Sequence, residues 1–128
     1  MLVEGIPMFR PLTIPIPARN DTPETKLYVK IIAKDEESLK TKPYIFMLPG
    51  GPGFNHSHYK DYGCLQDVSN VVFHDPRGCG LSEKGNSATY TMDNYIQDID
   101  VIRQYLEIPK INLVGKSYGV EFGQFCGF

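Results

Sequence analysis

Apolar and polar positions alternate in the first third of the chain and then give way to short apolar runs. Residues 26–34, KLYVKIIAK, alternate as a half-buried strand does. The runs at residues 44–48 (YIFML) and 70–73 (NVVF) are typical of buried strands. Residues 111–114, INLV, predict a further strand, and a helix is expected to begin just after it.

A helical pattern lies between the last two of these strands. Thr91 is a suitable N-cap, and Asp93 falls in the first turn, where the helix dipole favours an acid. Pro109 closes the element. The polar stretch DEESLKTKP, residues 35–43, predicts a turn. Apolar residues recur at helical spacing through the predicted helix: Tyr95, Ile99, Ile102 and Leu106.

The first 25 residues are rich in proline, which lacks a backbone donor, so they predict an edge strand or an extended lead-in. Short apolar strands with longer crossovers, one of them helical, indicate an α/β fold with a mostly parallel sheet. Such sheets place their sites at strand ends, where this chain carries glycine-rich segments. We expect one domain over residues 1–128, without an internal boundary. The prolines are Pro7, Pro11, Pro15, Pro17 and Pro23.

Composition supports a globular protein. Of the 128 residues, 41% are hydrophobic and 22% charged, and the net charge of -2 gives no general attraction to nucleic acid or anionic membrane. Cys64, Cys79 and Cys126 are widely spaced and form no C-x-x-C pair, which favours reduced thiols. The N-terminus lacks a signal-peptide pattern, and no run approaches the roughly 20 apolar residues of a membrane span. A soluble cytoplasmic protein is expected.

The segment Gly115-Lys116-Ser117-Tyr118-Gly119 follows the last strand and fits two chemistries. A phosphate loop needs a glycine five residues before Gly115, but Lys110 stands there, and a strand occupies the place of the loop. A nucleophile elbow needs strand, Gly-x-Ser-x-Gly and helix, and that order fits. The pattern therefore favours Ser117 as a nucleophile, with an inert serine in a tight turn as the alternative.

Two more glycine-rich segments follow the earlier apolar strands. PGGPG, residues 49–53, offers backbone N–H donors of the kind that stabilise an oxyanion, although a plain turn would look the same. In DPRGCGLS, residues 75–82, Arg77 can pair with Asp75 or with a backbone carbonyl. Gly78 and Gly80 permit a tight reversal. This third segment is interpreted as structural support.

Taken in order, LPGGPG, VVFHDPRGCGLS and INLVGKSYG resemble the motifs of the proline iminopeptidase (prolyl aminopeptidase) family of α/β-hydrolase serine peptidases. The likeness covers roughly residues 44–128. It implies the N-terminal part of an α/β-hydrolase fold: a leading antiparallel hairpin, then parallel strands with crossover helices, truncated after the elbow. It further implies a peptide substrate, cleaved after an N-terminal residue, usually proline, through an acyl-enzyme, without metal or organic cofactor.

The resemblance also assigns roles to residues. Ser117 would be the nucleophile, and the backbone N–H groups of Gly51 and Tyr118 would form the oxyanion hole. Pro49 stands where the family usually has histidine, and Pro76 where it has glutamine. The resemblance also implies supporting residues in the elbow, the oxyanion loop and the neighbouring turn: Gly115, Gly119, Gly50, Pro52, Gly53, Asp75, Arg77 and Gly78.

The triad of this fold runs Ser, then Asp or Glu, then His. After Ser117 the sequence has neither Asp nor His, and Glu121 falls within the expected elbow helix. The histidines all precede Ser117: His56, His58 and His74. His74 ends a strand near the site, but its place in the fold is wrong for the general base. We therefore expect this chain to be the N-terminal part of a longer enzyme and to be inactive alone. A small-acyl esterase of the same fold and a non-catalytic fragment or binding remnant are the alternatives.

Overall fold

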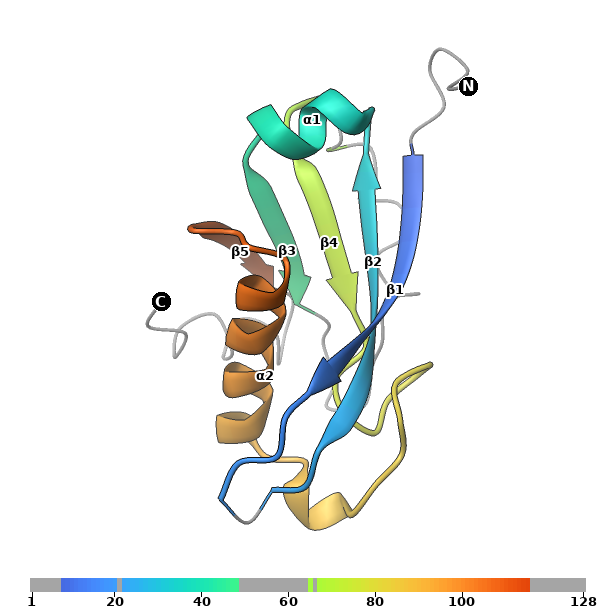
Figure 1. Ribbon diagram of the computed structural model, residues 1–128, viewed down its shortest axis with the longest axis vertical. Helices are drawn as coiled ribbons and strands as arrows, with labels where there is room; N and C mark the ends of the chain where they lie inside the picture. The colour runs from blue at the N-terminus through green and yellow to red at the C-terminus, as the bar shows by residue number, and fades with distance from the viewer. Residues whose placement is uncertain (1–7, 21, 49–64, 66, 116–128) are drawn as a thin grey trace.

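The computed structural model describes residues 8–20, 22–48, 65 and 67–115 (Figure 1). In this part of the chain five strands form one mixed sheet in the order β1-β2-β4-β3-β5. The β1–β2 hairpin is antiparallel, and β2 runs antiparallel to β4, whereas β3 is parallel to both β4 and β5. The elements are β1 (Met8–Ile16), β2 (Thr25–Ala33), α1 (Glu36–Thr41), β3 (Tyr44–Leu48), β4 (Asn70–His74), the 3-10 turn η2 (Ser87–Thr89), α2 (Met92–Tyr105) and β5 (Ile111–Gly115).

The predicted strands are confirmed, and so is the proline-rich edge strand. β1 pairs with β2 along its whole length, and Pro11 and Pro15 lie opposite Lys30 and Lys26. Proline has no N–H to donate to a neighbouring strand. Pro11 and Pro15 therefore occupy positions of β1 at which an N–H would point away from β2. The two prolines therefore interrupt the row of N–H groups on the outer side of β1.

The predicted turn at residues 35–43 contains a short helix, α1, at the end of the sheet where β3 and β4 begin (Figure 1). Asp35 caps it by accepting a hydrogen bond from the Ser38 N–H at 2.8 Å. Glu36 and Glu37 occupy the first turn and Lys40 the last, as the helix dipole favours. The buried Asn70 amide donates to the carbonyls of Ser38 and Lys42, at 2.8 and 3.1 Å, and so satisfies the end of this helix.

The core lies mainly between the sheet and α2, which covers one face of it (Figure 1). Tyr95, Ile99 and Ile102 of α2 are buried against alternate residues of the strands. A smaller cluster lies on the opposite face of the sheet. The strand residues facing α2 are Ile14, Ile16, Leu27, Val29, Ile31, Phe46, Leu48 and Val72, and the smaller cluster is Ile32, Met47, Val71 and Phe73. In the part of the chain that the structure describes, no helix is long and apolar enough to cross a membrane.

Candidate active site

The three strands that precede the motif segments in the sequence all end on the same side of the sheet. β3, β4 and β5 are parallel, so their carboxyl ends lie at the same edge of the sheet, where α/β folds place their sites. Leu48 and Gly115 are register partners at the ends of β3 and β5. Neighbouring strands lie about 4.8 Å apart. The last described residues of these two strands, Leu48 and Gly115, therefore lie side by side, and the DPRGCGLS segment begins one strand away from Leu48, after His74.

All three predicted catalytic residues, Ser117, Gly51 and Tyr118, lie outside the described part of the chain, and their roles stay predictions. Gly115 is described, as the last residue of β5, and so is the whole turn from Asp75 to Ser82. His56 and His58 also lie outside. The predicted site residues outside the description are Gly50, Gly51, Pro52, Gly53, Ser117, Tyr118 and Gly119.

The turn after β4 is organised around the buried Asp75. Its N–H donates to the Tyr28 carbonyl at 3.0 Å, continuing the ladder between β4 and β2. Its carboxylate accepts from the Leu81 N–H at 2.8 Å, and its carbonyl accepts from the Ser82 hydroxyl. That hydroxyl in turn accepts from the Tyr28 N–H at 2.9 Å. Asp75 therefore closes the turn on itself and attaches it to β2.

Gly78 and Gly80 make the reversal within this turn, as the sequence predicts. Their φ angles are +79° and +48°, in the region that favours glycine. The ring of Tyr90 lies where a side chain at position 78 would be, since a Cβ built there would come within 2.1 Å of Tyr90 Cζ. The Tyr90 hydroxyl is held at Gly85, accepting from its N–H at 2.9 Å.

Arg77 pairs with Asp98 of α2, whereas the sequence suggested Asp75 or a backbone carbonyl as its partner. Its Nε donates to Oδ2 of Asp98 at 2.7 Å and its Nη2 to Oδ1 at 2.8 Å. The two side chains are only 3% and 2% exposed. Two parallel charge-assisted bonds satisfy both buried charges, which fixes the turn against the helix.

Sequence reasoning missed Asp98, although a signal was present. The apolar residues Tyr95, Ile99 and Ile102 define the buried face of α2, and position 98 falls on that same face. A charged residue on the apolar face of a helix requires a buried partner of opposite charge. Arg77, on a glycine-rich turn, could have been predicted as the partner of Asp98.

His74 does not have the environment of a general base. Its side chain is 2% exposed, and burial lowers its pKa to about 4, although Asp75 and Asp98 act in the opposite direction. Within the described residues its Nδ1 has no hydrogen-bond partner. The imidazole is therefore neutral at pH 7 and enclosed in the molecule.

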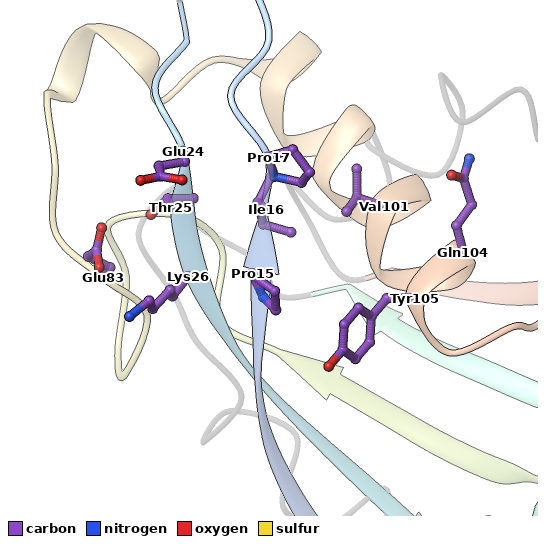
Figure 2. A pocket seen from close by; sticks show the side chains of 10 residues that line it. All are labelled: Pro15, Ile16, Pro17, Glu24, Thr25, Lys26, Glu83, Val101, Gln104 and Tyr105. Atoms are coloured by element: carbon purple, nitrogen blue, oxygen red, sulfur yellow. The ribbon is translucent and has the colours of Figure 1, made fainter.

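A cavity of about 740 Å³ lies between the turn end of the β1–β2 hairpin and α2 (Figure 2). Figure 2 shows Pro15, Pro17 and Tyr105 around it, with Glu24 and Lys26 on the β2 side. None of its lining residues is a predicted site residue. The cavity does not help to locate the chemistry, which the strand ends indicate instead.

The chain belongs to the α/β-hydrolase fold family, whose model matches residues 43–122. Among known proteins it is similar to proline iminopeptidases. That of Lactobacillus helveticus (strain DPC 4571) is 28% identical over 96 residues, which are 72% of this chain and 31% of the relative. That of Lactiplantibacillus plantarum is 30% identical over 95 residues, covering 72% and 32%. The chain thus spans about a third of the length of these curated relatives.

Solved structures agree on the fold. The proline iminopeptidase of Mycobacterium smegmatis superposes with a TM-score of 0.76 at 20% identity, covering 91% of this chain and 38% of that one. An epoxide hydrolase from Vigna radiata reaches 0.74 at 19% identity, covering 92% and 35%. Because enzymes of different chemistry match equally well, the likeness establishes the shared fold and does not select a reaction.

Proposed function

We propose that this chain is the nucleophile-bearing part of a serine hydrolase of proline iminopeptidase type. The observation that carries the proposal is the register pair of Leu48 and Gly115. It supports a site in which the PGGPG segment and the Gly-x-Ser-x-Gly segment meet, since they leave adjacent parallel strands at one level. The named relatives support the same reaction class.

In the proposed mechanism the Ser117 hydroxyl attacks the carbonyl carbon of the N-terminal residue of a peptide. The N–H groups of Gly51 and Tyr118 stabilise the resulting oxyanion. Collapse of this intermediate releases the shortened peptide and leaves an acyl-enzyme, which water then hydrolyses. The 128 residues contain no Asp or His after Ser117, so an activity test has to supply the remaining triad members.

A chimera tests the proposal. This chain would replace the equivalent N-terminal portion of the Mycobacterium smegmatis enzyme, which provides the missing part of the fold. We expect release of proline from proline p-nitroanilide, and labelling of Ser117 by a fluorophosphonate. Ser117→Ala should abolish both, because losing a triad serine costs on the order of 10⁶-fold in rate. Ser82→Thr, which keeps the hydroxyl that binds Asp75, should retain activity.

The other readings have distinct outcomes in the same assay. A chimera that cleaves short-chain esters in a Ser117-dependent way, and ignores proline amides, would identify a small-acyl esterase. A folded chimera with neither activity nor fluorophosphonate labelling would identify a non-catalytic fragment or binding remnant. Proline amide hydrolysis that survives Ser117→Ala would contradict the proposed nucleophile.

A further inference from the structure

Asp98 is shared by two arginines from different parts of the chain. Besides Arg77, it binds Arg19, whose Nη2 donates to Oδ1 at 2.7 Å. Arg19 lies in the turn of the β1–β2 hairpin, outside the residues that the family model matches, and its side chain is 19% exposed. The carboxylate therefore joins the hairpin to the motif turn, over sequence separations of 79 and 21 residues.

Arg19 makes these contacts with one nitrogen only. Its Nη2 also donates to Asn94, at 3.0 Å to the carbonyl and 3.3 Å to Oδ1. Its Nε and Nη1 are buried and have no partner in the described part of the chain. Buried donors without a partner are costly, and a buried ion pair often gains little over an apolar residue of the same shape. Net stabilisation is therefore a poor explanation of Arg19.

The hairpin end is nevertheless built to hold Arg19 against α2. Arg19 and Thr22 exchange backbone hydrogen bonds at 2.9 and 2.8 Å, closing the turn. The Thr22 hydroxyl donates to Oδ1 of Asn94 at 3.3 Å. Loss of Arg19 would leave the Arg77–Asp98 pair intact and neutral, so no charge would be orphaned. What would be lost is a second hydrogen bond that fixes how the Asp98 carboxylate is oriented.

We propose that Arg19 is a positioning residue: through Asp98 it holds Arg77, and with it the turn of residues 75–82, against α2. The hairpin thereby sets how often this turn opens. This role of Arg19 concerns the conformation of the turn and does not depend on the proposed hydrolase reaction. Because Arg19 uses a single nitrogen, a lysine at this position can make the same contact with Asp98, although arginine and lysine are not interchangeable at bidentate sites.

Cys79 provides a direct measure of turn opening. It lies within the turn and is 9% exposed, and burial raises the pKa of its thiol. Its alkylation in the native protein therefore requires local opening. The rate would be read for the Cys79 peptide by mass spectrometry, so that labelling of the two other cysteines of the sequence does not enter the measurement. The variants are Arg19→Met, Arg19→Lys and the control Arg10→Met, which removes an exposed ion pair from the same hairpin.

We expect Arg19→Met to raise the Cys79 labelling rate about tenfold, the size of effect that follows when one interaction between two coupled residues is removed. The midpoint of urea denaturation should change little, because only local opening is affected. Arg19→Lys should restore the wild-type rate, and Arg10→Met should leave it unchanged. An unchanged rate in Arg19→Met would overturn the proposal. So would a rise that global unfolding accounts for, or an Arg19→Met chain that fails to fold, since Arg19 would then serve overall stability.

Discussion

Two features of the structure favour glycine at position 78. Its φ of +79° is costly for any other residue, and the Tyr90 ring occupies the space of a Cβ. We predict that Gly78→Ala lowers the free energy of unfolding by about 2–4 kcal/mol, combining the backbone cost with overpacking. Urea denaturation followed by circular dichroism would measure the loss.

Gly85 is the matched control, because nothing lies within 4 Å of a Cβ built there. Gly85→Ala should change the free energy of unfolding by less than about 0.5 kcal/mol. Equal losses for the two variants would show that contact with Tyr90 does not restrict position 78.

The buried His74 makes stability depend on pH. Its pKa is about 4 in the folded protein, against an ordinary value of 6.5, because burial disfavours the charged imidazole. The unfolded chain therefore binds more protons between these values. The contribution of the neutral, buried His74 to the free energy of unfolding is therefore fully present above pH 6.5, and it is lost as the pH falls from 6.5 through 4. Between pH 7 and 4.5 the loss amounts to about 2.5 kcal/mol.

His74→Phe should remove this component. We expect the difference in stability between wild type and variant to shift by about 2.5 kcal/mol in favour of the variant when urea titrations at pH 7 and pH 4.5 are compared. Carboxylates titrate in both proteins and cancel in the comparison. Parallel loss in the two proteins would mean that His74 is protonated without penalty.

The conformation of a single residue could be predicted where it depends on the chemistry of that residue alone. Gly78 and Gly80 were assigned to a reversal because glycine tolerates positive φ, and their angles confirm it. The partner of Arg77 was not predictable in this way, since Asp75 is near in sequence but Asp98 is the residue that the fold brings opposite. Long-range pairing of charges depends on packing, which a local pattern does not contain.

At the scale of elements, the cap of α2 is open to a direct test. Thr91 was predicted from the sequence as the N-cap, and its hydroxyl accepts from the Asn94 N–H at 3.2 Å. Thr91→Ala should lower the free energy of unfolding by about 1 kcal/mol, because that N–H loses its partner at the helix start. Thr91→Ser, which keeps the acceptor, should lie close to wild type. If alanine and serine behave alike, the cap does not contribute.

The strands and α2 could be predicted because their apolar patterns are strong, and the ends of the four apolar strands differ from the expected ones by at most one residue. The short helix α1 was missed because a polar stretch of nine residues has no apolar period. Its capping signals were nevertheless present: Asp35 precedes two glutamates, and Lys40 falls in the last turn. Capping residues can therefore indicate a short helix even where the sequence has no apolar period.

At the scale of the molecule, Asp98 joins the hairpin, the motif turn and α2. Asp98→Asn removes the negative charge from between two arginines and leaves Arg77 buried without a counter-ion. We predict a loss of about 3–5 kcal/mol in the free energy of unfolding, the usual result of breaking a buried pair. Chemical denaturation at pH 7 measures it.

Asp100→Asn is the control on the same helix. Asp100 pairs with Arg103 at 2.7 Å, but its side chain is 31% exposed. Its loss should cost less than about 1 kcal/mol, since solvent screens the pair. Comparable losses for the two aspartates would indicate that water reaches Asp98 in the folded protein.

The strand order of the sheet could not be derived from periodicity, because β3 inserts between β4 and β5 through long-range pairing. What the resemblance of three ordered motifs to a known family did predict was the α/β-hydrolase fold, with a leading antiparallel hairpin and parallel strands after it, and the family match bears out that fold. The candidate site was likewise placed by where strands end. The roles of Ser117, Gly51 and Tyr118 remain sequence-based predictions.

The prolines of β1 have a consequence for how this protein meets other chains. An incoming extended peptide at the β1 border would find amide hydrogens missing at Pro11 and again four residues later, at Pro15. Self-association into fibril-like stacks through that border is thereby discouraged. β5, the other outermost strand of the described sheet, contains no proline, so this obstacle to strand pairing lies on the β1 side alone.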